Sequence, residues 1–409
     1  MYAIRDKGAE PPIYCFTVEC SLIFSFFILR ERRKKTTYNS DRGDIIFAKN
    51  YYRQFKLRLP HPDTIDQVMR DLPPQLPEEL KAQLVGRLIE QKTLRKFRVQ
   101  GRYYFVAVDA TGIQTFTKRH CEHCLTRTSK KGVVTYFHYV LEAKLVSSLG
   151  HAISLASEFI ENLEHRDFDK QDCEQKAFGR LAAKIKHYFP RLPICILADG
   201  LYPNDTTFGI CRRNNWRFII TLKEKCLKSF NEEAGLLNAT AKGCSVARAS
   251  KTTRTMLEYK FLNDIEYKKH NYSWVSCIET VTHRSEMIKK VQQFVYITDL
   301  HQTPGNVVKT ADGGRLRWKI ENEGFNSQKN SGYKMEHKYS RTSYTALQNY
   351  YQMLQIAHMI NQFTEKSRDF IGLMNQHSKQ TIKALWKELL TFMKSIPYTP
   401  TQLQIFISS

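Results

Sequence analysis

Residues Tyr103–Asp109 read YYFVAVD. This aromatic and β-branched run ends in a carboxylate, and its composition is typical of a buried strand. A second run, Pro193–Asp199 (PICILAD), also ends in aspartate. Because it is otherwise apolar throughout, it predicts a central strand with both faces covered. We therefore expect Asp109 and Asp199 at the carboxyl ends of two neighbouring core strands.

Strand and helix patterns on either side of these runs predict an α/β fold, a mixed sheet flanked by helices. Two further strand-like runs, Ile113–Thr117 and Val133–Val146, follow the first and predict a three-stranded antiparallel meander. Helical patterns follow at about 151–164, 171–189 and 204–214, and a strand is expected at 216–222.

Changes in composition and in the helix and strand patterns along the chain predict four parts. The first is a basic, helical N-terminal domain with a DNA-binding role, and the second is a core made of two segments. A β-rich insertion separates these segments, and a helical segment closes the chain. The expected bounds are 1–98 for the N-terminal domain, 99–225 and 300–376 for the core, 226–299 for the insertion and 377–409 for the last segment.

The charge of the chain points to a polyanionic partner. Its 409 residues contain 63 Lys and Arg against 40 Asp and Glu, a net charge of +23. Such an excess favours nucleic acid as the partner. With 42% hydrophobic and 12% aromatic residues, the composition is that of a folded protein and excludes a disordered basic tail.

The apolar stretch Ile13–Leu29 raises the question of a membrane span. It is interrupted by Glu19, it is shorter than the usual ~20 residues, and its basic cluster follows it rather than precedes it. We therefore expect a buried helix, neither a membrane span nor a signal peptide. A cytoplasmic protein without a membrane partner is the corresponding expectation.

Ten scattered cysteines indicate a reducing compartment rather than a disulfide scaffold. Only Cys121-Glu122-His123-Cys124 has the spacing of metal ligands. A single CxxC lacks the second pair that typifies zinc sites, so the pattern alone does not establish a structural zinc. Its candidate ligands are Cys121, Cys124 and His123, with His120 and His138 as further candidates.

The two strand-ending aspartates suggest metal chemistry. Ligands gather at the carboxyl ends of strands in α/β sheets, and carboxylates can approach a polyanion only with a cation between them. Two Mg²⁺ or Mn²⁺ ions ~3.5–4 Å apart would activate a water and stabilise the leaving oxygen at phosphorus. The alternative is that each aspartate only opens a turn, as aspartates commonly do.

The segment Gly313–Glu323 (GGRLRWKIENE) offers the third carboxylate. On a helix expected at about 314–329, Arg317, Glu321 and Gln328 share one stripe and Glu323 lies on the other side. Glu321 is therefore the candidate. The alternative is a surface ion pair, because Arg317 and Glu321 are four residues apart.

Three motifs together resemble the DDE transposases of bacterial insertion sequences, specifically the insertion-sequence-four-like group. They are VDATG at Asp109, LADGLY at Asp199 and RLRWKIENEGFNSQKN at Glu321, with the β-rich segment before the last. The resemblance implies an RNase H-like core in which these three residues are catalytic and bind the metals. Arg317 matches the arginine of a DNA-contacting signature, whereas Gly314 and Gln328 stand at its tyrosine and lysine positions.

The resemblance also implies an activity. A protein of this family binds insertion-sequence ends, hydrolyses phosphodiester bonds with two divalent metals and joins the 3′-hydroxyl ends to target DNA. It acts as a homodimer on double-stranded DNA in the bacterial cytoplasm, associated with the nucleoid. A metal-dependent nuclease without strand transfer and a catalytically inactive DNA-binding relative are the alternatives. The candidate DNA-binding residues are Arg315, Arg317, Trp318, Lys319 and Lys329, although an indole beside an apolar stripe more often lies in the core, where we expect Trp318.

Overall fold

The computed structural model describes residues 43–55, 58–99, 101–118, 121–161, 170–250, 253–283, 289–376, 381–397 and 399. These residues form two compact units, and each is described by itself. The larger unit comprises residues 79–325 apart from the turn at 120–122, and the smaller unit comprises the rest.

The centre of the larger unit is a parallel set of three strands. In it, β2 (Tyr103–Phe116) pairs with β6 (Ile194–Ala198), which pairs with β7 (Arg217–Thr221). Two helices belong to this set: α6 (Lys170–Tyr188) precedes β6, and α7 (Asp205–Arg213) connects β6 to β7. All five residues of β6 are buried, as its continuously apolar sequence predicts.

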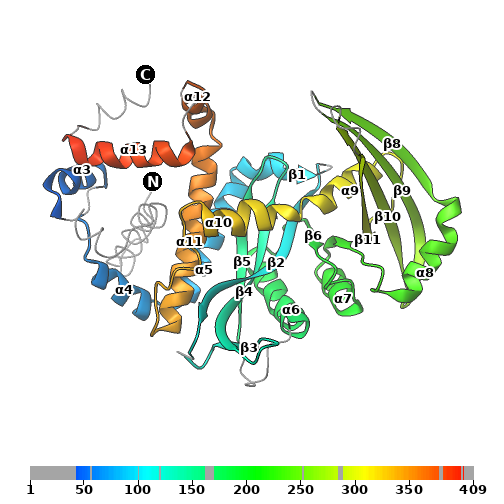
Figure 1. The fold of residues 1–409 in the computed structure, drawn as a ribbon, viewed down its shortest axis with the longest axis horizontal. Helices are drawn as coiled ribbons and strands as arrows, with labels where there is room; N and C mark the ends of the chain where they lie inside the picture. Colours follow the sequence, from blue (N-terminus) through cyan, green and yellow to red (C-terminus); the bar gives the residue numbers. More distant parts are fainter. Residues whose placement is uncertain are drawn as a thin grey trace. The chain divides into compact units, whose positions relative to one another are not determined.

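Antiparallel strands extend the sheet on one side of β2 (Figure 1). The long strand β4 (Val134–Val146) pairs with β2, with the short β3 (Leu125–Thr128) and with β5 (Ala152–Ile160). The expected helix at about 151–164 is therefore wrong over β5. A turn at Gly150, with φ 80°, reverses the chain after β4 and starts the pairing of Val146 with Ala152.

On the other side of β7, the strand-rich segment joins the same sheet. Four antiparallel strands follow one another there, and the last, β11, pairs with β7, giving the order β3-β4-β2-β6-β7-β11-β10-β9-β8. The elements are α8 (Lys228–Leu236), a 3-10 turn (Leu237–Thr240), β8 (Lys242–Ala249), β9 (Thr253–Tyr267), β10 (His270–His283) and β11 (Lys289–Thr298).

The segment after the strand-rich part is not the single α-helix that the sequence predicts. α9 (Val307–Arg315) ends earlier, and a π-helical segment, Ile320–Asn326, follows a short turn. A Cβ atom at Gly313 would lie 2.5 Å from the ring of Phe105, and one at Gly314 would lie 2.5 Å from the ring of Tyr296. The two glycines therefore let the end of α9 lie directly against the sheet.

The smaller unit is helical. Its long helix α11 packs against α4, and Asn349 fixes this contact by donating hydrogen bonds to the carbonyl oxygens of Met69 (2.8 Å) and Leu72 (2.7 Å). A second contact joins α13 to α3. The helices are α3 (Ile45–Phe55), α4 (Pro62–Asp71), α10 (Ser327–Asn330), α11 (Tyr344–Glu365), α12 (Arg368–Gln376) and α13 (Ile382–Ser395).

Three remaining elements lie before β2. They are α5 (Gln75–Glu90), a 3-10 turn (Thr93–Phe97) and the two-residue strand β1 (Arg98–Val99), which pairs with β2. None of the helices within the described ranges has the length and apolarity that crossing a membrane requires. The apolar stretch Ile13–Leu29 lies outside those ranges.

Candidate active site at the carboxyl ends of the central strands

The pairing register places Asp109 and Asp199 beside each other in the larger unit. The parallel ladder pairs Tyr104 with Ile194 and runs to Ala107 with Leu197. Both aspartates lie two residues beyond this last pair, so their positions on the two neighbouring strands are equivalent. Asp199 directly follows the end of β6, but the expectation that Asp109 ends its strand is wrong, because β2 continues to Phe116 through its pairing with β4. The carboxyl end of a strand such as β6 is the place where α/β sheets bind ligands.

The turn that the alternative interpretation predicts after Asp199 is present. The Leu201 N–H donates a hydrogen bond of 2.9 Å to the Asp199 carboxylate, and the Tyr202 N–H donates one of 3.2 Å to its carbonyl oxygen. Oδ1 of Asp199 accepts the turn hydrogen bond, which holds the side chain at the carboxyl end of β6. Asp199 therefore opens a turn at a position that adjoins Asp109 in register.

Asp109 is largely buried, and its carboxylate faces a cation. Its Oδ1 accepts a hydrogen bond of 2.8 Å from the Ala110 N–H, and its Oδ2 lies 3.4 Å from Nη1 of Arg317. Burial raises the pKa of Asp109 to about 7; Arg317 acts in the opposite sense, and Glu321 raises the pKa further. At neutral pH the Asp109 carboxyl is therefore only partly ionised, even with Arg317 beside it.

Arg317 joins Asp109 to Glu321. Its Nη1 also lies 2.8 Å from Oε1 of Glu321, so one guanidinium contacts both carboxylates. The residue is only 7% exposed, and its guanidinium carbon lies 4.9 Å from the centre of the Trp318 ring. The ion pair expected between Arg317 and Glu321 is thus present, although Glu321 lies in a π-helical segment.

The three carboxylates do not form a ready set of metal ligands in this arrangement. Asp109 and Glu321 meet through Arg317, and Asp199 adjoins Asp109 by register. Among the described residues, the group of three or more metal-binding side chains with suitable spacing is a different one, Cys121, Cys124 and His138. A divalent cation at the carboxylates therefore requires Arg317 to move from between them.

Glu174 of α6 is a buried carboxylate near the site that sequence reasoning missed. It is 1% exposed, and it accepts hydrogen bonds of 3.2 Å from the hydroxyls of Tyr139 and Tyr202. Burial raises the pKa of Tyr202, and the negative charges of Glu174, Asp109 and Asp199 raise it further. The Tyr202 hydroxyl therefore lies near both Asp109 and Asp199. The available signal was a polar stretch with two carboxylates, Asp172 and Glu174, at the start of a helix between two motifs.

A buried ionic cluster lies next to Asp109 in the sheet. Glu142 of β4 pairs with Asp109 across the strands, and its carboxylate lies 3.3 Å from Nζ of Lys144. Ser154 and Ser157 of β5 donate to Glu142, and Nζ of Lys81 lies 2.9 Å from both serine hydroxyls.

Each charge in this cluster depends on its partners, because Lys81, Glu142 and Lys144 have no exposed surface. Burial alone would raise the pKa of Glu142, but the two ammonium groups and the serine hydroxyls lower it overall. Burial lowers the pKa of Lys144 to about 8 despite the attraction of Glu142. Lys144 also lies 5.7 Å from the ring centre of Phe325, so the cluster supports the π-helical segment that carries Glu321.

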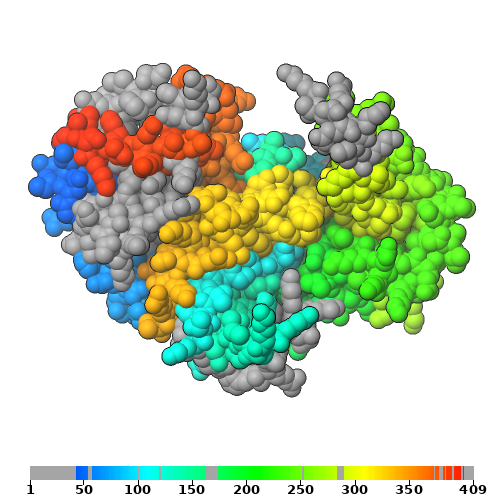
Figure 2. Space-filling model, in the orientation of Figure 1, coloured from blue at the N-terminus to red at the C-terminus, as the bar shows by residue number. Residues whose placement is uncertain are grey.

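The basic residues among the DNA-binding candidates form ion pairs. Arg315 is paired with Glu279 at 3.0 Å, and Lys319 is paired with Glu323. Trp318 is 49% exposed, so the expectation that it belongs to the core is wrong. The residues that follow α9, coloured yellow, reach the surface in Figure 2.

Gln328 and Gly314 stand at the lysine and tyrosine positions of the DNA-contacting signature, and Gln328 is not placed on one helix with Arg317 as expected. Gln328 belongs to the smaller unit, where its buried amide donates a 2.8 Å hydrogen bond to Gln355 and contacts His358 at 2.9 Å. Lys329, in the same unit, pairs with Glu336 at 2.9 Å. At the tyrosine position, Gly314 leaves room for the ring of Tyr296 from β11.

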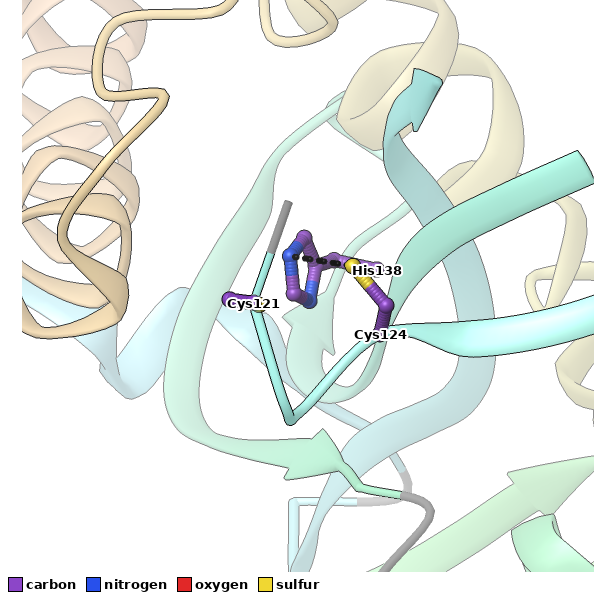
Figure 3. Close-up of side chains that lie close together, drawn as sticks. All are labelled: Cys121, Cys124 and His138. Carbon is purple, nitrogen blue, oxygen red and sulfur yellow. Dashed lines mark hydrogen bonds between the residues drawn. The ribbon is translucent and has the colours of Figure 1, made fainter. Parts of the chain in front are cut away.

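The CxxC motif lies beside His138, one of the further candidate ligands that the sequence offered. The ligand atoms of Cys121, Cys124 and His138 lie within 4.8 Å of one another, as Figure 3 shows. The sequence-based choice of His123 differs from this set, because Nδ1 of His123 lies 3.3 Å from Oε2 of Glu161. His138 is brought to the motif by the β3–β4 pairing, which sequence spacing alone does not reveal.

Comparison of the chain with models of known protein families and with curated proteins found no match. Its function therefore has to be inferred from the chemistry of its own residues.

Proposed function

We propose that this chain is a DDE transposase of the insertion-sequence-four-like group with an RNase H-like catalytic core. The observation that carries the proposal is the equivalent register of Asp109 and Asp199 on adjacent parallel strands. Glu321 reaches the same place through Arg317. The order of these three residues in the chain, with a strand-rich segment before the third, supports the proposal.

The sheet is compatible with such a core. Strands β5, β4 and β2 are antiparallel neighbours, and β2, β6 and β7 are parallel neighbours with helices in their connections. This arrangement brings Asp109, in the middle of β2, beside Asp199 at the end of β6. Because fold alone does not imply activity, the proposal rests on the carboxylates at that position.

The residues fit hard divalent cations. Asp109, Asp199 and Glu321 offer carboxylate oxygens, the ligands that Mg²⁺ and Mn²⁺ prefer. A bound cation would favour the ionised form of Asp109, which burial opposes. Two such ions, when bound, would activate the attacking water and stabilise the leaving oxygen. The three carboxylates hold and orient them, while the adjoining cluster around Glu142 fixes the strand that carries Asp109.

Arg317 has two positions in this proposal. In the structure it neutralises Asp109 and Glu321, and in the DNA complex its guanidinium turns to a backbone phosphate as cations take its place. Trp318, half exposed beside it, offers an aromatic face to a base. Arg315, Lys319 and Lys329 add positive charge to a chain whose net charge of +23 already favours DNA. The protein would act as a homodimer on double-stranded DNA in the bacterial cytoplasm.

A catalytically inactive DNA-binding relative is the second candidate, and the position of Arg317 favours it. A guanidinium held between two carboxylates satisfies their charge without any metal ion. In that case Arg317 would be a permanent structural cation, and the protein would bind DNA without cutting it.

Incubation of the purified full-length protein with Mg²⁺ and labelled DNA from both flanks of its gene tests the proposal. Transposition predicts cleavage at defined ends followed by joining of the 3′-hydroxyls to a second DNA. Asp109→Asn, Asp199→Asn and Glu321→Gln should each abolish both steps, and Glu323→Gln should leave them intact. Cleavage without joining would identify a nuclease, and binding without cleavage would identify the inactive relative.

A further inference from the structure

The turn between β2 and β3 and the facing strand β4 bring together three side chains that bind soft metals. Cys121 lies in the turn, Cys124 directly precedes β3, and His138 lies on β4. Cys124 is 0% exposed and His138 is 1% exposed, whereas Cys121 is partly exposed. In Figure 3 the imidazole of His138 lies between the two cysteines.

The distances are close to those of a metal centre. Zinc bonds of about 2.3 Å to sulfur and about 2.0 Å to nitrogen, at tetrahedral angles, place ligand atoms roughly 3.6–3.8 Å apart. Sγ of Cys124 and Nε2 of His138 are 3.8 Å apart, and all three ligand atoms lie within 4.8 Å of one another. A shift of about 1 Å in one side chain would therefore complete the geometry.

We propose that Cys121, Cys124 and His138 bind one Zn²⁺ ion, with water at the fourth position. Two thiolates and an imidazole form a donor set that favours zinc over the magnesium expected at carboxylates. A metal also makes a thiolate acceptable at the buried position of Cys124, where an unpaired charge would be costly. The partial exposure of Cys121 gives water access to the fourth position.

The site would fasten the outer end of the antiparallel strands. His138 pairs with Gln114 of β2, just after an irregularity in the β2–β4 register at Gly112. A zinc ion there would tie the turn after β2 to the middle strand of the β2–β4–β3 pairing. This role does not depend on the proposed transposase activity, because the carboxylates of that site are not among its ligands.

Zinc content of the full-length protein, purified without added metal, tests the assignment. Mass spectrometry of the metal should give one zinc per chain in the wild type. Cys121→Ser, Cys124→Ser and His138→Asn should each lower zinc affinity at least about tenfold, whereas His123→Asn and Cys244→Ser should keep it. Far-UV circular dichroism of every variant separates loss of the metal from loss of the fold.

A second measurement identifies the ligands directly. Replacement of zinc by Co²⁺ should produce a thiolate-to-cobalt absorption band that weakens when either Cys121 or Cys124 is changed to serine. Three results would overturn the proposal: a wild-type protein with no more zinc than the His138→Asn variant, equal loss of zinc in the His123 and Cys244 controls, or a disulfide between Cys121 and Cys124 in the protein as purified.

Discussion

Nη1 of Arg317 lies 3.4 Å from Oδ2 of Asp109, although 208 residues separate them in the chain. The same nitrogen contacts Glu321 at 2.8 Å, so the arginine compensates two carboxylates that would otherwise repel each other. Removal of Arg317 would leave both carboxylates without this cation. This relationship makes the stability of the protein sensitive to the same residues that we propose for catalysis.

Replacing Arg317 by alanine should therefore destabilise the metal-free protein. It leaves Asp109 and Glu321 close together without a cation, at a cost on the order of 1–3 kcal/mol. Urea unfolding would measure this loss, and Mg²⁺ should recover more stability in the variant than in the wild type. Arg248→Ala is the matched control, because the Arg248–Asp312 pair is exposed and should contribute little. Equal losses in the two variants would contradict the account.

Asp109→Asn should have opposite effects on stability and activity. Burial opposes ionisation of Asp109, so the neutral amide should raise the metal-free free energy of unfolding at pH 8 by on the order of 1–3 kcal/mol. Cleavage should be lost in the same variant. Thermal unfolding in the presence of a chelator provides the measurement, with Asp312→Asn as the control at a more exposed carboxylate. A lower unfolding temperature in Asp109→Asn would show that the ionised carboxylate stabilises the fold.

The same group predicts a dependence of stability on pH. Its pKa rises from 3.8 to about 7 on folding, so the folded state binds more protons between these values. The stabilising contribution of protonated Asp109 is fully present below pH ~4 and is lost as pH rises through about 7. The difference in stability between wild type and Asp109→Asn should therefore change across this interval in chelator. A constant difference from pH 5 to pH 8 would refute the assignment.

Loss of one charged residue from the buried cluster should lower the free energy of unfolding more than loss of both members of the Glu142–Lys144 pair. Lys144→Met leaves the Glu142 carboxylate buried with one ammonium group fewer, which should cost about 3–5 kcal/mol. Adding Glu142→Gln to this variant should recover part of the loss, because the uncompensated charge disappears. A double-mutant cycle by urea unfolding measures the coupling. Additive losses would mean that the ion pair contributes nothing specific.

Gly314 should tolerate no side chain. A Cβ atom there would lie 2.5 Å from the Tyr296 ring, so Gly314→Ala should destabilise the larger unit by about 1–3 kcal/mol. Gly235→Ala in α8 is the control, since no atom lies within 4 Å of its Cβ position and the helix should gain slightly. Chemical denaturation distinguishes the two substitutions. A Gly314→Ala variant as stable as wild type would mean that Tyr296 moves freely.

The core strands of the fold were predictable because their signal is local. The apolar run before Asp199 and the aromatic and β-branched run before Asp109 each form a buried strand, as expected. The separate strand expected at Ile113–Thr117 is instead the continuation of β2, because both parts pair with β4. The α/β class with a mixed sheet flanked by helices is confirmed on this basis.

Other features depend on distant partners and were not predictable in this way. The residues of β5 (AISLASEFI) include several good helix formers, but pairing with β4 overrides that preference. The sequence named His138 as one of several candidate ligands, and strand pairing selects it by placing it beside Cys124. Gln328 was expected on one helix with Arg317, but that helix is interrupted. The pair Glu142 and Lys144 was visible in the sequence as two charges within an apolar strand. The third charge of the cluster, Lys81 of α5, could not be predicted, because the fold brings it there from another element.

Binding of Mn²⁺ to the full-length protein tests the central claim most directly, because it measures the metal at the carboxylates without knowledge of the DNA sequence recognised. Calorimetric titration should show binding to the wild type. Asp109→Asn and Asp199→Asn should each weaken it about tenfold or more, and Glu323→Gln should leave it unchanged. Equal Mn²⁺ affinity in wild type, Asp109→Asn and Asp199→Asn would contradict the proposed metal site and, with it, the proposed reaction.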